Sequence, residues 1–244
     1  MPALKLEDLR VLVAGKPVVD GLSLTVAPSE IVALIGAPGC GKSTLMRAIF
    51  GLVHPAAGRI VYNDKALASH SPLQSIANGV VLVPQGGRVF RTLSVEQNLE
   101  LAGYTLDVQR IKARTSMIYE IFPRLAERRR QIAGSLSGGE RQMLALAMGI
   151  FTEPRLLLLD EPSTGLSPIM TTRMLETIKT LSAELQCSVL LVEQNVRNAV
   201  QISDRVLVMD RGRISHAHDV IDRRDLAPLL DAYAFTRSVD APTT

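Results

Sequence analysis

One stretch constrains the fold of this chain more than any other. The strand-like run Ile31–Ile35 is apolar throughout, as in a parallel strand buried on both faces, and Ser43–Phe50 predicts a helix that ends at Gly51. The segment between them fits G-x-x-x-x-G-K-[S/T], in which successive backbone N–H groups converge on phosphate oxygens at a helix N-terminus. A glycine turn that merely ends a strand is the alternative, but both flanks favour nucleotide binding. The predicted phosphate-binding residues are Gly36, Ala37, Pro38, Gly39, Cys40, Gly41, Lys42, Ser43 and Thr44.

Two side chains of this loop have predicted roles beyond the backbone. Lys42 is expected to reach the β- and γ-phosphates of a nucleotide, and the Ser43 hydroxyl to ligate Mg²⁺. Cys40 lies in the same positive environment, which favours a lowered pKa and a reactive thiol, although a small packing residue is the more common role.

A second apolar strand, Leu156–Leu159, ends in two acids, Asp160 and Glu161. An apolar strand followed by acids is common and usually means only a strand that meets solvent. At the carboxyl edge of a parallel sheet that also carries the phosphate loop, however, Asp160 can hold the Mg²⁺ shell. Glu161 can then polarise the attacking water.

Composition excludes several classes of protein. With 244 residues, 47% hydrophobic and 21% charged, the chain has enough apolar residues for a sizeable core. Two cysteines are too few for a disulfide framework or a four-cysteine zinc site. The first ten residues contain no signal-peptide core, and the apolar runs are strand-sized, whereas a membrane span needs about 20 apolar residues. The net charge of +3 and 4% aromatic residues disfavour nucleic acid as a partner. Because the cysteine count, the first ten residues and the short apolar runs all disfavour secretion and membrane insertion, we expect a soluble cytoplasmic protein.

The remaining pattern is that of an α/β core interrupted by helices. Helical spacing and many Leu, Glu and Arg residues run from about Val95 to Gln131, and further helices are predicted over Ser137–Phe151 and Ile169–Leu185. The turn Asp210-Arg211-Gly212 predicts a closing hairpin between Val206–Met209 and Arg213–Ile214. Further predicted strands are Leu4–Leu12, Leu22–Val26, Val80–Val83 and Val189–Val192.

The segment Leu136-Ser137-Gly138-Gly139-Glu140-Arg141-Gln142 decides the family. It resembles L-S-G-G-[E/Q]-x-Q, the signature of ATP-binding-cassette (ABC) ATPases, and the resemblance covers about residues 4–215. It implies a single ABC ATPase domain over 1–244: an α/β fold with a P-loop NTPase core, an antiparallel β-subdomain and an inserted helical subdomain. The implied boundaries are 1–91 and 153–234 for the nucleotide-binding core, 92–152 for the helical subdomain with the signature, and 235–244 for a loose tail.

The signature predicts a second phosphate site in the same chain. Ser137, Gly138 and Gly139 open a helix, where backbone donors favour an anion. One chain holds only one phosphate tail on its loop, so a second site implies a dimer in which each signature closes over the other subunit's ATP.

The resemblance also assigns residues to the reaction, with ATP and Mg²⁺ as the cofactors. Gln85 matches the Q-loop glutamine, whose amide contacts the metal and the water, so the implied metal ligands are Ser43, Gln85 and Asp160. The implied catalytic residues are Glu161, Gln85 and Gln194, the last at the position of the family's switch histidine. Two more departures are Ser167, where the D-loop segment Ser163–Ser167 usually ends in Asp, and Val13, where an aromatic usually stacks on adenine.

Four short segments narrow the subfamily: V-E-Q-N at 192–195, G-L-S-P at 165–168, G-R-V-F at 87–90 and I-F-P-R-L-A-E-R-R at 121–129. They resemble one of the two ATPase subunits of branched-chain amino acid importers, the one with Gln at the switch position. The implied function is to energise import of branched-chain or other hydrophobic amino acids. The ATPases of urea and short-amide importers share V-E-Q and stay open as an alternative.

The resemblance implies partners and a location. The partners are transmembrane permease subunits, a second ABC ATPase subunit and, indirectly, an extracytoplasmic solute-binding protein, with no nucleic acid. A heterodimer is expected and a homodimer is left open. The implied location is the cytoplasmic face of the inner membrane, peripherally through the permease. One rival is a soluble ABC ATPase acting on nucleic acid or ribosomes, but such proteins carry a coiled-coil insertion or two cassettes. Another rival, a degenerate regulatory subunit, conflicts with intact Lys42, Asp160 and Glu161.

Overall fold

The computed structural model of the chain describes residues 3–67, 70–220, 229–231 and 233. One of its two sheets is antiparallel and has four strands in the order β2-β1-β4-β5. Its long strands alternate buried and exposed residues, as expected for a sheet with one covered face. The strands are β1 (Leu4–Val13), β2 (Lys16–Val26), β4 (Ala57–Tyr62) and β5 (Lys65–Ala66).

The other sheet has six strands in the order β10-β9-β3-β8-β7-β6 and is parallel except at β10. The three strands β3, β7 and β8 are buried along their whole length, which explains their continuous apolar sequences. The strands are β3 (Ile31–Ile35), β6 (Val80–Val83), β7 (Leu156–Asp160), β8 (Ser188–Val192), β9 (Arg205–Asp210) and β10 (Arg213–Asp219).

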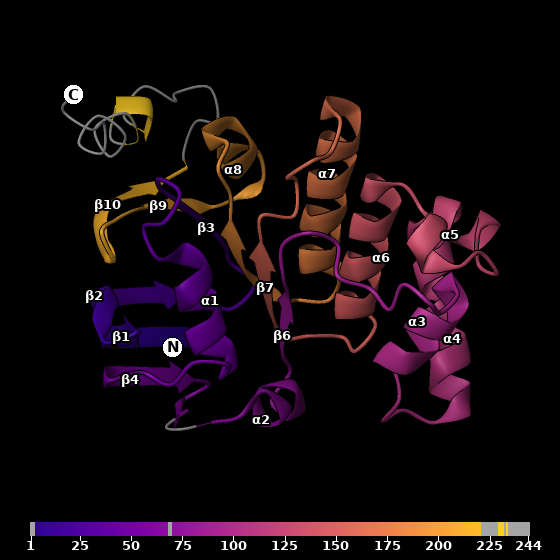
Figure 1. The fold of residues 1–244 in the computed structure, drawn as a ribbon, viewed down its shortest axis with the longest axis horizontal. Helices are drawn as coiled ribbons and strands as arrows, with labels where there is room; N and C mark the ends of the chain where they lie inside the picture. Colours follow the sequence, from indigo (N-terminus) through magenta and orange to yellow (C-terminus); the bar gives the residue numbers. More distant parts are fainter. Residues whose placement is uncertain (1–2, 68–69, 221–228, 232, 234–244) are drawn as a thin grey trace.

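Alternate side chains of the six-stranded sheet point to opposite faces and enter different cores. Leu156 and Leu158 of β7 pack with the antiparallel sheet and with α1 (Lys42–Phe50), which lies between the two sheets in Figure 1. Leu157 and Leu159 pack on the opposite face with the remaining large helices. This alternation is the two-residue period of a strand, and it fixes the sheet between two apolar layers.

The helices on that opposite face include the predicted insertion. The core there combines Leu99, Ile118 and Leu125 with the inner face of α6, and Figure 1 places α3, α4 and α5 at the end farthest from the antiparallel sheet. These helices are α3 (Val95–Ala102), α4 (Val108–Ile121), α5 (Pro123–Glu127), α6 (Gly138–Ile150) and α7 (Pro168–Glu184). The others are α2 (Pro72–Ala77), α8 (Val196–Ile202) and a 3₁₀ turn at Ala133–Ser135.

Most predicted elements are present. The strands Ile31–Ile35 and Val80–Val83 have the predicted bounds, and Gly51 ends α1 with a left-handed φ of 85°. The hairpin β9–β10 is also confirmed, with Arg211 and Gly212 both at positive φ. Among the described residues five elements were not predicted: β4, β5, α2, the 3₁₀ turn Ala133–Ser135 and α8. The predicted loose tail 235–244 lies outside the described residues.

Candidate active site

The strand order brings the predicted site residues to one edge of the sheet. Because β3, β8, β7 and β6 are parallel neighbours, the loops that follow them meet at their carboxyl ends. These loops carry the phosphate-binding segment, Gln194, Glu161 and Gln85, and Asp160 is the last residue of β7. A hollow of about 310 Å³ lies there, lined by Val18, Pro38, Gly39, Gly41, Lys42, Ser43, Thr44, Gln85, Glu161 and Gln194.

The phosphate-binding loop needs glycine at two positions for steric reasons. A Cβ on Gly36 would overlap the carbonyl oxygen of Met209, and one on Gly41 would lie 2.6 Å from that of Val18. Gly41 also has a φ of 110°, which side-chain-bearing residues rarely adopt. It forms the N-cap of α1 without any side-chain cap, so the first N–H groups of the helix are left for an anionic ligand.

Lys42 is buried within the loop it follows. Its Nζ donates hydrogen bonds to the carbonyl oxygens of Gly36 (2.8 Å) and Ala37 (2.9 Å) and lies 3.6 Å from Cys40 Sγ. The ammonium group thus organises the loop around a positive charge, where phosphate oxygens would bind.

Cys40 does not have the lowered pKa that the sequence left open. It is buried, and burial raises the pKa of its thiol, while the charge of Lys42 only partly opposes this effect. The reactive-thiol hypothesis is therefore wrong, and Cys40 belongs to the packed core beneath the loop.

Ser43 and Asp160 meet although 117 positions separate them. The Ser43 hydroxyl donates to Asp160 Oδ1 at 3.1 Å. Burial raises the pKa of the Asp160 carboxyl, the charge of Glu161 raises it further, and the bond from Ser43 lowers it. Hydroxyl and carboxylate oxygens are ligands that Mg²⁺ prefers, so the pair fits that ion. Among the described residues no three His, Cys, Asp or Glu side chains cluster as a metal site.

Glu161 lies at the centre of the polar network. Its φ of 51° is unusual for a residue with a side chain and marks a constrained backbone. Its carboxylate accepts hydrogen bonds from Gln85 Nε2 at 2.6 Å and Gln194 Nε2 at 2.8 Å. The Thr164 hydroxyl donates a third at 3.1 Å. The structure thus brings the three predicted catalytic residues together and adds Thr164, which the sequence analysis missed.

The signature residues lie apart from this hollow. Ser137 is the N-cap of α6: its hydroxyl accepts from the Glu140 N–H at 3.3 Å, and the Glu140 carboxylate accepts from the Ser137 N–H at 2.9 Å. Neither Ser137 nor Gly138 or Gly139 lines the phosphate-loop hollow. The two bonds form a complete capping box at the start of α6.

Two of the positions that depart from the family pattern have clear surroundings. Val13 ends β1, is 46% exposed and does not line the hollow, whereas Val18 does. Ser167 is the N-cap of α7, and its hydroxyl accepts from the Met170 N–H at 3.5 Å. Serine is a good N-cap, so this role accounts for Ser167 locally.

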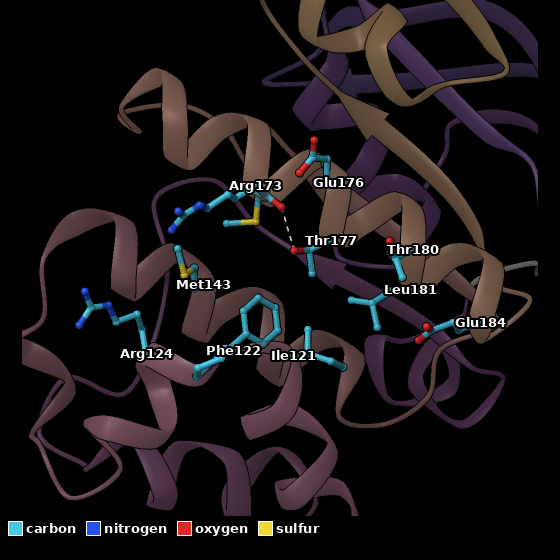
Figure 2. A pocket seen from close by; sticks show the side chains of 12 residues that line it. Ile121, Phe122, Arg124, Met143, Arg173, Glu176, Thr177, Thr180, Leu181 and Glu184 are labelled. Carbon is cyan, nitrogen blue, oxygen red and sulfur yellow. Dashed lines mark hydrogen bonds between the residues drawn. The ribbon is translucent and has the colours of Figure 1, made fainter.

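A second hollow, of about 400 Å³, lies between α7 and the helices α4, α5 and α6 (Figure 2). Apolar side chains such as Phe122, Met143 and Leu181 line it, and Arg124 and Arg173 stand at one side in Figure 2. None of the predicted site residues lines this hollow, so it is separate from the strand-edge site.

Comparison with known proteins places these features in a family. The family model described as ABC transporter matches residues 19–164. The chain belongs to the ABC transporter family. The chain is therefore an ABC ATPase, which binds and hydrolyses ATP.

Two curated relatives and one solved structure show how closely the chain resembles this family. BraG of Pseudomonas aeruginosa, a high-affinity branched-chain amino acid transport ATP-binding protein, is 42% identical over 193 residues, which are 79% of this chain and 82% of BraG. LivF of Archaeoglobus fulgidus, whose name also refers to branched-chain amino acid transport, is 38% identical over 78% of this chain and 80% of LivF. The structure of an ATP-binding subunit of an ABC transporter superposes with a TM-score of 0.83 at 26% identity, covering 96% of this chain and 99% of that chain.

Proposed function

We propose that this chain is the ATPase subunit that energises import of branched-chain or other hydrophobic amino acids. The observation that carries the proposal is the similarity to BraG, at 42% identity over 79% of the chain. The short segments quoted above, such as V-E-Q-N at 192–195, support the same subfamily.

In the proposed mechanism the chain's own residues bind the phosphates and position the water. The uncapped start of α1 and Lys42 hold the triphosphate. Ser43, Asp160 and Gln85 would hold Mg²⁺, whose charge offsets the negative charge that gathers on the phosphate oxygens. Glu161 polarises the attacking water, and its hydrogen bonds from Gln85 and Gln194 keep the carboxylate at the carboxyl edge.

The signature residues Ser137, Gly138 and Gly139 would cap an ATP held by the other subunit of a head-to-tail dimer. Support comes from their position: they open a 13-residue helix outside the chain's own hollow. A phosphate there would replace the long bond between the Ser137 hydroxyl and the Glu140 N–H. ATP binding then closes the dimer because the closed state has more contacts with the nucleotide than the open one.

The dimer partner is proposed to be a different ATPase. Gln194 cannot take up a proton as a histidine does, so a homodimer would contain two sites of the same altered type. In a heterodimer the signature of this chain faces a site that can carry the histidine.

The proposed location is the cytoplasmic face of the membrane, with attachment through permease subunits. The described part of the chain has no helix that is long and apolar enough to cross a bilayer. The Q-loop region, which includes Arg88 to Phe90, would transmit closure to the permease. This region is tied to the helices of the insertion, because Asn98 of α3 binds both backbone groups of Phe90. The Phe90 N–H donates to Asn98 Oδ1 at 2.8 Å, and Asn98 Nδ2 donates to the Phe90 carbonyl at 3.1 Å. Phe90 itself is 53% exposed, and so available to a partner.

Affinity purification of the tagged full-length chain from membranes tests this arrangement. Permease subunits and a second, different ATPase should co-purify with it. A complex with ribosomes or nucleic acid would favour the soluble rival, and a transporter with two copies of this chain would exclude the heterodimer.

A further inference from the structure

Glu193 is a buried acid beside the site that the proposed mechanism does not use. It directly follows β8, is 1% exposed, and its backbone N–H still donates to the Leu34 carbonyl at 3.2 Å. Within the described part of the chain it has no ion-pair partner. Burial raises the pKa of its carboxyl to about 6, hydrogen bonds from Ser163 oppose this shift, and the charge of Glu161 adds to it. A buried, unpaired carboxylate costs folding free energy, so packing alone does not explain its presence.

Both oxygens of this carboxylate bind one residue of the neighbouring loop. The Ser163 N–H donates to Glu193 Oε1 at 3.3 Å, and the Ser163 hydroxyl donates to Oε2 at 2.9 Å. Asn198 Nδ2 donates to the same hydroxyl at 3.3 Å. Because β8 and β7 are adjacent, these two hydrogen bonds connect the end of β8 to the loop that follows β7.

Ser163 opens the D-loop, Ser163–Ser167, which touches two functional regions. At one end Thr164 donates to Glu161 Oε2 at 3.1 Å. Farther along, Leu166 lies against the signature: a Cβ on Gly139 would be 3.3 Å from Leu166 Cδ2. Holding Ser163 therefore fixes the loop against the hydrolytic carboxylate and the signature helix together.

The D-loop has room to move if the hydrogen bonds between Ser163 and Glu193 are lost. Thr164 and Gly165 are exposed. A hollow of about 400 Å³ lies beside the loop, lined by Ser163, Thr164, Leu166, Pro168, Thr171, Thr172, Glu193, Gln194, Asn195 and Asn198. Since packed neighbours do not hold the loop on that side, its restraints there are the hydrogen bonds of Ser163 with Glu193 and Asn198, and Glu193 makes two of the three.

We propose that Glu193 is a positioning residue for ATP hydrolysis, which acts by holding Ser163 so that the D-loop keeps Thr164 on Glu161 and Leu166 on Gly139. The proposal rests on the role assigned to Glu161 above. It predicts an effect on turnover and not on nucleotide affinity, because Glu193 does not line the phosphate-loop hollow.

The test compares Glu193→Met with Glu193→Gln in the full-length chain, by steady-state hydrolysis of MgATP. Methionine is close in size but has no comparable acceptor, so kcat should fall about tenfold while KM stays within twofold. Glutamine accepts from the Ser163 N–H through its carbonyl oxygen and donates to the hydroxyl through its amide, so kcat should stay within about threefold of the wild type. Glu184→Met, an exposed acid on α7, is the matched control and should leave both constants unchanged.

Thermal unfolding of the same variants separates positioning from folding. Glu193→Met should keep a Tm within a few degrees of the wild type, because the lost hydrogen bonds are offset by removal of a buried charge. Wild-type kcat in Glu193→Met, a Glu193→Gln variant as impaired as Glu193→Met, or a rise in KM alone would overturn the proposal. Glu161→Gln measured alongside tests the proposed base separately: normal turnover in that variant contradicts the base and leaves the Glu193 comparison interpretable.

Discussion

Replacing Glu161 with Gln removes one negative charge from the centre of the site and keeps the size of the side chain. The carboxylate accepts from two amide groups, those of Gln85 and Gln194, and from the Thr164 hydroxyl. A glutamine at 161 offers one acceptor and one donor, and either neighbouring amide can rotate to present its oxygen to the new donor. The variant should therefore fold normally.

The expected loss of turnover in Glu161→Gln is on the order of 10²-fold or more, the usual contribution of a positioned general base. This corresponds to about 2.7 kcal/mol of transition-state stabilisation or more. ATP binding should be unchanged or tighter, because the variant removes a negative charge beside the triphosphate. The Asp160 pKa should move down, since the charge of Glu161 is one of the causes that raise it.

The assay combines equilibrium binding of ATP with steady-state hydrolysis at saturating MgATP, on the wild type and Glu161→Gln. Exposed Glu184 on α7 supplies the matched control, Glu184→Gln, which should retain wild-type turnover. Wild-type turnover in Glu161→Gln would refute the role of this carboxylate. Loss of ATP binding in Glu161→Gln would instead show that the charge shapes the phosphate site.

Three further outcomes are expected. By the family pattern position 13 faces the adenine, although Val13 does not line the phosphate-loop hollow. Val13→Tyr should on that pattern raise ATP affinity about three- to tenfold, because an aromatic face on a base is worth ~1–3 kcal/mol. Equal ATP titrations for the two proteins would show that position 13 does not face adenine. Glu193→Gln should raise the free energy of unfolding at pH 7 by up to about 2 kcal/mol, since the native pKa of about 6 exceeds the reference of 4.5 and the charged form is disfavoured by folding. This gain in unfolding free energy should shrink as pH falls from 6 and vanish below about 4.5. Denaturant unfolding of both proteins at pH 4 and pH 7 measures it, and the same difference at both pH values would contradict the prediction. Chelation of Mg²⁺ should stop hydrolysis, and Ser43→Ala should raise the Mg²⁺ concentration needed for half the maximal rate. Hydrolysis that a chelator does not affect would argue against Ser43 and Asp160 as Mg²⁺ ligands.

The helices and strands that could be predicted are those determined by residues close together in the sequence. Ile31–Ile35 is apolar at every position and is a fully buried strand, and Gly51 ends α1 as the only residue type that adopts its φ without strain. The missed elements have weaker local signals: β4 begins with the exposed residues Ala57–Arg59, and α2 has only six residues. The hairpin strand β10 extends to Asp219, beyond the predicted Ile214, because it is an exposed edge strand that needs no apolar face.

The site residues that belong to a sequence motif could be predicted, whereas contacts that depend on the order of the strands could not. Lys42, Asp160 and Glu161 follow from their motifs. The contact of Ser163 with Glu193 depends on β8 lying beside β7, and their separation along the chain does not reveal that order. The contact of Thr164 with Glu161 spans only three residues, but it depends on the turn that follows β7, for which the sequence analysis had no signal. An acid directly after a buried strand was the one available signal for Glu193.

The uptake of labelled leucine tests the central claim most directly. In cells from which the gene for this chain has been deleted, ATP-dependent leucine uptake should fall. The wild-type chain should restore it, whereas the Glu161→Gln chain, expressed to the same level, should not. Leucine uptake that is the same with and without the chain, together with urea or short-amide uptake that follows it, would contradict the proposed substrate class.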